Sequence, residues 1–474
     1  MRTFKIKSKT PTDSPMAINH SDTGAVNQNR TDSDVIHTSL FKLGWPIFIQ
    51  ALLSMCLGYI DTLMISHYSD TAVGGIGNAS QITGFLTLAF SIISSATGVV
   101  VAQYLGAKIS DKINEIYSVS IAFNLVISVI ISAIILLLNR PLLKLLKVQP
   151  SMFSDAGTYM RIVGGFIFLE AVFDTFSQIF RSNGRTKIGM ITSIIMNLVN
   201  IAGNYMFLYG PLKFLEMGVA GVAISTTVSR VIAVIIAILY FNKKIDGKIS
   251  ISYLIPFHFD ILGKLLKIGI PTAGENISYN IAQLMIMMFV NSLSAVAVNT
   301  KIYAGILSNF AYLFSISAAM AASIVVGHSV GASDYDYAYH KVLSTLKKSM
   351  VVSVSIALAG YYISPITFGI FTDNKDIITL GHKIMLICIF LEIGRTANLV
   401  IINSMRAAGD VRFPTFLGMA SMWGVSVLLG YILGIVMGYG LTGIWIAMAM
   451  DELLRGVVVF VRWCRGGWRG KRIV

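Results

Sequence analysis

The sequence predicts an all-α integral membrane protein with twelve transmembrane helices in two six-helix bundles related by pseudo-two-fold symmetry. Three observations lead to this fold class: the composition, the number of long apolar stretches and an internal repeat. Apolar types make up 55% of the 474 residues and charged types only 13%, and the mean hydropathy is +0.73. A soluble domain carries about 25% charged residues. The chain therefore has too little polar surface to face water, and we expect it in lipid.

Twelve stretches are long and apolar enough to cross a bilayer, which takes about 20 residues of helix. They are 40–66, 75–102, 116–139, 156–180, 187–210, 218–241, 262–292, 303–328, 345–370, 377–405, 412–437 and 440–461. The second stretch has the weakest apolar signal, because Gly74, Gly75, Gly77 and Asn78 dilute it. Twelve spans place both ends of the chain on the same side of the membrane.

Basic residues predict which side that is. With the N-terminus inside, the inner loops receive most of the Lys and Arg residues between spans, including Arg181, Arg185 and Lys187. The positive-inside rule then puts both termini in the cytoplasm of a multi-pass protein of the cell inner membrane. These loops also account for the net charge of +14. Because no Lys/Arg stripe lies outside them, nucleic acid is excluded as a partner.

The spans divide the chain into five regions. They are a disordered cytoplasmic tail (1–38), an N-terminal six-helix bundle (39–241), a cytoplasmic linker (242–261), a C-terminal six-helix bundle (262–462) and a basic cytoplasmic tail (463–474). The first tail is polar and lacks the apolar stretch of a secretory signal. The basic cluster around the last tail is expected to lie against anionic lipid head groups.

The chain repeats itself at one fixed offset, the separation between Gly44 and Gly269. The other pairs matched at this offset are Pro46 and Pro271, Gly106 and Gly331, Arg181 and Arg406, and Gly184 and Gly409. Two halves of six helices in the same orientation predict two bundles around an axis along the membrane normal, with a cavity between them. A site between two rocking bundles can face either side of the membrane in turn, as a transporter requires.

Five runs carry a resemblance to a known family. They are 58–66, 102–107, 181–187, 197–204 and 218–224. Together with the duplication and the length, they resemble the multidrug and toxic compound extrusion (MATE) family from Ser39 to Arg462. The resemblance implies a secondary antiporter that expels small organic, often cationic, compounds as Na⁺ or H⁺ enters. Those ions would be transported, and no cofactor is implied.

The chain departs from two branches of that family. The NorM branch places a Glu deeper in the seventh helix and an Asp in the tenth, whereas here the acid is Glu275 and Arg395 occupies the register of the Asp. The DinF-like branch has an Asn followed four residues later by Asp in the fifth helix, and here Asn200 is followed by Asn204. The resemblance is therefore to a bacterial branch that differs from both patterns.

Carboxylates inside a bilayer cost about 2.5 to 3.5 kcal/mol on insertion scales, so each is a functional candidate unless it is paired. Asp61, with Asn200 and Asn204 four apart on one helix face, would offer the oxygen donors that a small cation prefers. This predicts an ion-coupling cluster. The alternative is that the two asparagines only join helices by hydrogen bonds.

Glu170 and Asp174 are also four apart on one helix face. Because like charges at that spacing repel, we expect at least one to be protonated or neutralised, which suits a proton carrier in the coupling machinery. The alternative interpretation is that Asp174 caps the inner end of its helix and bonds to Arg181.

In the second half, Glu392 and Arg395 stand at the spacing of an intrahelical ion pair. An arginine stays charged at any working pH and needs a carboxylate partner in the membrane. Either Glu392 or Glu275 can supply it. The simpler interpretation is a structural ion pair, and the other is a switch in which Glu275 and Arg395 pair in one state of the cycle only.

The substrate cavity is predicted from polar and adaptable side chains. They are Gln50 on the stripe of Asp61, and Glu275, Tyr279, Gln283 and Met287 along the seventh helix. Met and aromatic side chains adapt to varied guests, although a Met stripe in a membrane helix also occurs facing lipid.

Other classes of protein lack their signatures. No cluster of Cys and His could hold a metal, no phosphate-binding loop indicates ATP use, and no convergent set of residues indicates a membrane enzyme. A channel filter would need a ring of repeated elements. Two alternatives stay open: a flippase of lipid-linked sugar intermediates, which needs several cations in its cavity, and a dedicated metabolite exporter. We expect a monomer whose partners are a small organic substrate and the bilayer.

Overall fold

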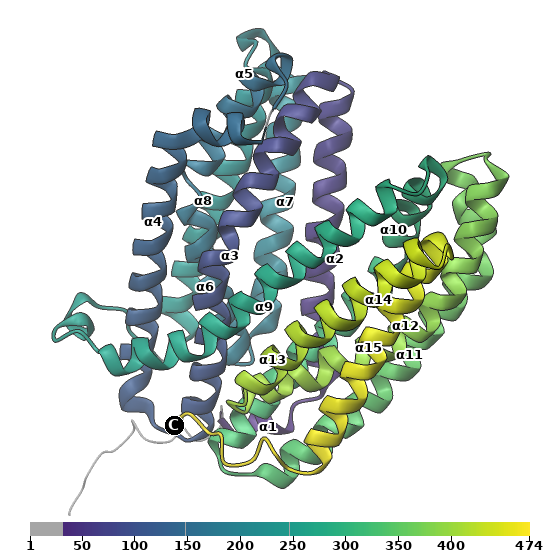
Figure 1. Ribbon diagram of the computed structural model, residues 1–474. Coiled ribbons are helices and arrows are strands. Elements are labelled where there is room, and N and C mark those ends of the chain that lie inside the picture. The colour runs from purple at the N-terminus through teal and green to yellow at the C-terminus, as the bar shows by residue number, and fades with distance from the viewer. Residues whose placement is uncertain (1–31, 147, 246) are drawn as a thin grey trace, which may run out of the picture.

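The computed structural model describes residues 32–146, 148–245 and 247–474, and within these ranges it contains helices and no strand. Figure 1 shows α2 to α8 on one side of the molecule and α10 to α15 on the other, with α9 crossing obliquely between them. The two groups lie close together at the end that carries the C-terminus and diverge away from it.

The first half of the chain holds eight α-helices. They are α1 (Asp32–His37), α2 (Leu40–Ser66), α3 (Asp70–Gly106), α4 (Ile113–Leu145), α5 (Pro150–Tyr159), α6 (Phe168–Ser182), α7 (Thr186–Leu208) and α8 (Gly218–Lys244). The second half holds α9 (Phe259–Asn291), α10 (Ala295–Gly331), α11 (Tyr335–Phe371), α12 (Lys375–Ala407), α13 (Arg412–Ser421), α14 (Leu428–Tyr431) and α15 (Gly440–Cys464). Short π-helical segments follow α5 (Met160–Gly164), α13 (Met422–Val427) and α14 (Ile432–Val436).

Each of the twelve stretches predicted from the sequence falls on a helical segment. Within the described ranges, nine helices are long and apolar enough to cross a membrane, and ten if the bent pair around Phe166 is one span. The other two segments are α9, which carries a row of amide and hydroxyl side chains, and α15, which carries Asp451, Glu452 and Arg455. These polar side chains lower the mean hydropathy of the two helices.

The fourth predicted span is bent rather than straight. Its two pieces, Pro150–Gly164 and Phe168–Ser182, meet at an angle of 46°. Gly164 and Gly165 stand at the break, where a Cβ at Gly165 would lie 2.4 Å from the carbonyl oxygen of Arg161. The bend places Glu170 in the first turn of α6, which directs its carboxylate toward α8.

The first helix of each half packs against the other half. The first part of α9 (Ile261, Leu265 and Ile268) belongs to the core that α3, α4, α6 and α8 form, whereas its last part packs in the core of the second half. In the same way, α2 packs against α10 through Leu43 and Ile47. The halves are therefore joined by burial of apolar surface, which is the dominant favourable contribution to packing.

The two predicted tails differ from expectation near the membrane helices. Residues 1–31 lie outside the described residues, but 32–37 form α1, and the Tyr337 hydroxyl donates to the carbonyl oxygen of Ile36 at 2.9 Å. At the other end, the indole rings of Trp463 and Trp468 stack at 4.1 Å, while Arg462 and Arg469 form ion pairs with acidic side chains. These arginines bind protein groups, so the C-terminal segment is more than the lipid-binding cluster that its composition predicts.

Candidate functional site

The two halves close on each other where α3 crosses α10. A Cβ at Gly106 would lie 2.0 Å from the carbonyl oxygen of His328, and one at Gly331 would lie 2.1 Å from that of Gln103. Only glycine allows two backbones to approach so closely. The two glycines are one of the pairs matched by the internal repeat, so the repeat seen in the sequence is also a repeat of contacts.

Two buried hydrogen bonds flank this crossing and obey the same offset. Gln103 donates through Nε2 to the carbonyl oxygen of Ala407 at 2.6 Å, and His328 Nε2 lies 2.6 Å from the carbonyl oxygen of Ser182. Each bond joins one half to the last residues of a helix in the other half. His328 therefore links the halves and does not simply cap its own helix.

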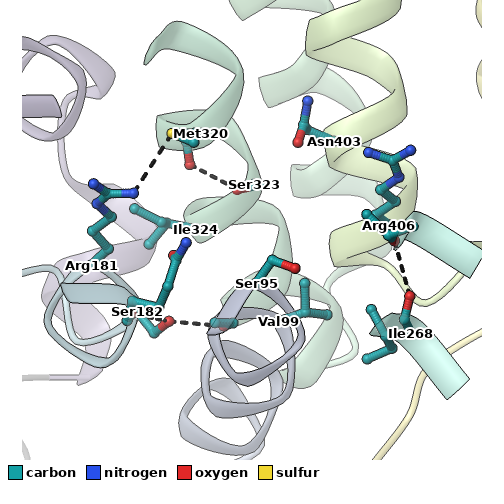
Figure 2. Close-up of a pocket in the computed structure, with 13 residues that line it drawn as sticks. Ser95, Val99, Arg181, Ser182, Ile268, Met320, Ser323, Ile324, Asn403 and Arg406 are labelled. Carbon is teal, nitrogen blue, oxygen red and sulfur yellow. Dashed lines mark hydrogen bonds between the residues drawn. The ribbon is translucent and has the colours of Figure 1, made fainter. Parts of the chain in front are cut away.

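Two arginines flank a small cavity between the halves, of about 110 Å³. Figure 2 shows Arg181 and Arg406 on opposite sides of it. Arg181 donates to Gln50 Oε1 at 2.9 Å and Arg406 donates to Glu275, again at equivalent positions of the repeat. Neither arginine has a partner for its buried Nε among the described residues. We call this region, from the glycine crossing to the two arginines, the closure.

The predicted cluster in the first half forms as a connected set of side chains. Asn204 donates through Nδ2 to Asp61 Oδ1 at 2.8 Å and lies 3.1 Å from Asn200 Oδ1, and Asn200 donates to Thr226. Asn204 is completely buried, and its Oδ1 has no hydrogen-bond donor among the described residues. A carboxylate beside an unsatisfied amide oxygen offers hard oxygen ligands to a proton or a small cation.

Glu170 is neutralised by a residue that the sequence analysis did not single out. Arg230 on α8 lies 2.8 Å from the Glu170 carboxylate. Its position inside an apolar stretch was the available signal, because a charged side chain there is costly without a partner. The repulsion expected between Glu170 and Asp174 is thereby relieved.

Asp174 does not bond to Arg181, which binds Gln50 instead. Within the described part of the chain, the Asp174 carboxylate has no hydrogen bond or ion pair, although its side chain is half-buried. The capping interpretation is therefore wrong in this conformation. Gln50 and Asp61 share a helix but lie in different sites, since Gln50 belongs to the closure.

The second half contains a larger charged network. The expected pair forms, with Arg395 Nη1 2.5 Å from Glu392 Oε1. Arg455 lies 2.8 Å from Asp451 and 3.1 Å from Glu452. The last three residues were missed by sequence reasoning, although three charges within one apolar helix are a clear signal.

Glu275 pairs with Arg406 and not with Arg395. The switch interpretation required contact between Glu275 and Arg395, and in this conformation each has another partner. The physical reason is position: Glu275 faces the closure, to which the end of α12 brings Arg406. The partner of Arg395 is the Glu three residues before it on the same helix.

A cavity of about 420 Å³ lies in the second half. Of the residues predicted for the substrate cavity, Glu275, Tyr279 and Gln283 line this cavity, whereas Met287 and Gln50 are not among its lining residues. Its charged lining residues are Lys301, Arg395, Arg406, Arg455, Glu275 and Glu452. We call it the second-half cavity. It has the size of a small-molecule site, about 300 to 1,000 Å³.

The repeat places opposite charges at equivalent positions of the two halves. At the offset that matches Gly106 to Gly331, Glu170 corresponds to Arg395, whereas Arg230 corresponds to Arg455. A Glu–Arg ion pair in the first half is therefore replaced by two arginines in the second, which Glu392, Asp451 and Glu452 neutralise. The shared scaffold holds sites of different polarity.

Comparison with known proteins bears on both the repeat and the fold. The MatE family model matches the chain twice, over residues 46–206 and 271–432. The two matches begin at Pro46 and Pro271. These prolines are equivalent positions of the internal repeat, like Gly106 and Gly331 in the closure. The same model therefore describes both halves.

Curated relatives cover nearly the whole chain. An uncharacterized transporter of Bacillus subtilis, YisQ, is 39% identical over 91% of this chain and 94% of its own length. A probable multidrug resistance protein, NorM, of Thermotoga maritima is 24% identical over 93% of this chain and 94% of its own. Among solved structures, an outward-facing multidrug resistance MATE family transporter superposes with a TM-score of 0.84 at 16% identity, covering 92% of this chain and 97% of that one. This last likeness confirms the fold.

Proposed function

Because the chain belongs to the MATE family of transporters, we propose that it is an antiporter that exports small organic, mainly cationic, compounds while H⁺ or Na⁺ enters. We further propose that it works as a monomer by alternating access between two six-helix bundles of the cell inner membrane, with both termini in the cytoplasm. A transporter role, rather than that of an enzyme, agrees with the relatives described above.

One observation carries the coupling proposal: the Asp61 carboxylate contacts Asn204, whose buried Oδ1 lacks a donor among the described residues. A buried polar oxygen without a partner costs free energy. A bound cation would supply the missing interaction, and so would a proton on Asp61 once the Asn204 amide has turned its Oδ1 toward the carboxyl group. The same site then has two stable forms, with and without the ion. A coupling site needs this property, because a ligand shifts a conformational equilibrium only when its affinity differs between the two conformations.

The closure supports the alternating-access proposal. It joins the halves at the end where the predicted inner loops lie, through contacts that would all separate if that end opened. Loss of these bonds must be offset by new contacts at the opposite end. Ion binding at Asp61, which lies on the helix that also packs against α10, is positioned to influence that balance.

The coupling proposal is tested with purified protein in liposomes. Uptake of a fluorescent lipophilic monocation is measured under a Na⁺ gradient without a pH gradient, and then under a pH gradient without Na⁺. One of the two gradients is expected to drive accumulation, and the other is not. Accumulation in neither case, while the protein still binds the probe, would contradict ion-coupled antiport.

A second candidate function is the flipping of lipid-linked sugar intermediates. Such a protein needs several cations for a diphosphate, and the second-half cavity contains three beyond Arg395: Lys301, Arg406 and Arg455. Glu275 and Glu452 lie on the same wall and already bind two of them, so a diphosphate would meet two carboxylates. Translocation of a fluorescent lipid diphosphate in the same liposomes, without any ion gradient, would favour this function over antiport.

A further inference from the structure

One cation on the wall of the second-half cavity, Lys301, has no acidic partner among the described residues. Of the four cations on the wall, Arg406 is bound to Glu275 and Arg455 to Glu452, and both carboxylates also lie on the wall. Arg395 is bound to Glu392, which is 1% exposed and is not part of the wall. Lys301 has no hydrogen bond or ion pair among the described residues.

A half-buried ammonium group without a counter-ion is unfavourable, because much of its hydration is lost and nothing replaces it. The Lys301 side chain is partly buried in the second turn of α10. Arg395 lies deeper, on α12, with its guanidinium carbon 5.9 Å from the centre of the Tyr312 ring. The wall therefore presents one cation without an acidic partner, Lys301, and an aromatic ring beside an arginine whose charge Glu392 balances.

We propose that the second-half cavity binds a small aromatic organic anion, whose carboxylate is attracted by Lys301 and whose ring packs against two tyrosines of the same wall, Tyr279 and Tyr312. This goes beyond the proposed export of cations and assigns the second half a ligand of opposite charge. Aromatic rings supply apolar burial, and Lys301 supplies the charge that selects an anion over a neutral analogue.

The wall acids do not reverse this preference. Glu275 and Glu452 each have a cationic partner, and Asn398 donates a further hydrogen bond to Glu452. An incoming cation would have to displace Arg406 or Arg455 to reach them. An incoming anion displaces no ion-pair partner of Lys301 among the described residues. At the position equivalent to Arg395, the first half has Glu170.

Equilibrium binding to the purified full chain in uncharged detergent tests the proposal. Three probes of nearly the same shape are compared by calorimetry: 2-naphthoate, 2-naphthamide and 2-naphthylmethylammonium. The carboxylate is expected to bind at least about tenfold more tightly than the other two, with an affinity that falls as salt is added. Equal affinities, or tighter binding of the ammonium probe, would overturn the proposal.

Variants identify the residues. Lys301→Gln is expected to weaken 2-naphthoate about tenfold and to leave 2-naphthamide unchanged, while Lys301→Arg restores the anion. Lys375→Gln is the matched control, because it removes the same charge from an exposed position at the start of α12. The pair Glu392→Gln with Arg395→Gln keeps the net charge of the protein and leaves Lys301 in place, so it should retain the preference for the anion.

Two further results separate this inference from the functions proposed above. Binding at equilibrium needs no ion gradient, so its result does not depend on whether Na⁺ or H⁺ coupling is correct. Inorganic diphosphate is added as a competitor: weak competition supports an aromatic carboxylate as the ligand, whereas displacement at lower concentration than 2-naphthoate itself overturns it in favour of a diphosphate. Failure of Lys301→Gln to change 2-naphthoate binding also overturns the assignment.

Discussion

The two halves of the molecule have the same contacts at the closure and different charges at mid-depth. At the closure, Gly106 and Gly331, and Gln103 and His328, occupy equivalent positions and make equivalent contacts. Deeper in the membrane, the first half has the Asp61 cluster and a Glu170–Arg230 pair, whereas the second has arginines and a larger set of acids. Sterics explain why the closure is symmetric, since a backbone crossing this close admits only glycine.

This difference in charge indicates which positions a duplicated transporter can use for separate tasks. Side chains that face a cavity or a water-filled space can change charge provided that a partner changes with them. The second half meets this condition by adding Glu392, Asp451 and Glu452 around its arginines. We therefore expect ion coupling to depend on the first half, and ligand selection to depend in part on the second.

The largest expected effect comes from Asp61→Asn, which should abolish ion-driven export. The amide keeps the volume and can still accept the hydrogen bond from Asn204, but the only formal charge of the cluster is lost. Transport should fall to the background of empty liposomes, and the folded fraction in detergent should stay unchanged.

The matched control is Asp376→Asn, which makes the same substitution on an exposed helix terminus and should leave export unchanged. Export by Asp61→Asn at the rate of the unaltered protein would remove the coupling role from the first half. Asn200→Ala and Asn204→Ala should weaken ion affinity more than the maximum rate; unchanged ion dependence in both would leave them as links between helices.

The next effect is on stability and concerns the second half. Arg395→Ala leaves Glu392 buried without its partner, which should cost about 3 to 5 kcal/mol. Combining it with Glu392→Gln should recover most of the loss, because no buried charge is then unpaired. Combining it with Glu275→Gln should not, since Glu275 is bound to Arg406. Thermal unfolding in detergent measures all three, and equal rescue by both acids would show that Arg395 exchanges partners.

Most of the fold could be predicted from the sequence, because apolar span length and the positions of Gly and Pro follow from local chemistry. The contact between Asp61 and Asn204 was also accessible, since buried polar groups in lipid must find one another. The partners of Glu275 and Glu170 were not. Which arginine pairs with each of these glutamates depends on how far α12 and α8 extend past neighbouring helices and on the 46° bend between α5 and α6. The periodicity of the sequence does not contain this information.

A smaller effect tests the symmetry of the closure. Gly106→Ala and Gly331→Ala each place a methyl group about 2 Å from a backbone carbonyl oxygen, and overpacking of this kind costs about 1 to 3 kcal/mol. Both should favour opening. A cysteine introduced at Ser95, which lines the small cavity, should then be labelled faster by a water-soluble maleimide in a chain whose exposed Cys56 and Cys464 are replaced by Ser. Gly84→Ala and Gly305→Ala, on the same two helices with no atom near the new methyl group, should not change labelling. A response from only one of the two crossing glycines would show that the closure is asymmetric.

The smallest effect concerns the C-terminal segment, which breaks the symmetry of the closure. The backbone N–H of Ile473 donates to Gln103 Oε1 at 2.8 Å, and Ile473 and Val474 pack against the core of the first half. The segment thus ties the end of the second half to α3 of the first. Ending the chain after Gly470 removes this part-buried hydrogen bond, worth about 0.5 to 1.5 kcal/mol, and also the bond from Arg472 to Ser333 and the packing of Ile473 and Val474. It should raise labelling of Ser95→Cys a few-fold.

Arg469→Gln is the control for the C-terminal truncation. It removes the ion pair with Asp336, whose side chain is 81% exposed, and exposed pairs contribute about 0 to 1 kcal/mol. Labelling of Ser95→Cys in this variant should match that of the intact chain. If the truncated protein is also labelled at that rate, Ile473 does not hold the closure, and the halves are joined there by the α3–α10 crossing and the two arginines alone. If it is labelled faster, the last residues add a link between the halves that has no counterpart in the internal repeat.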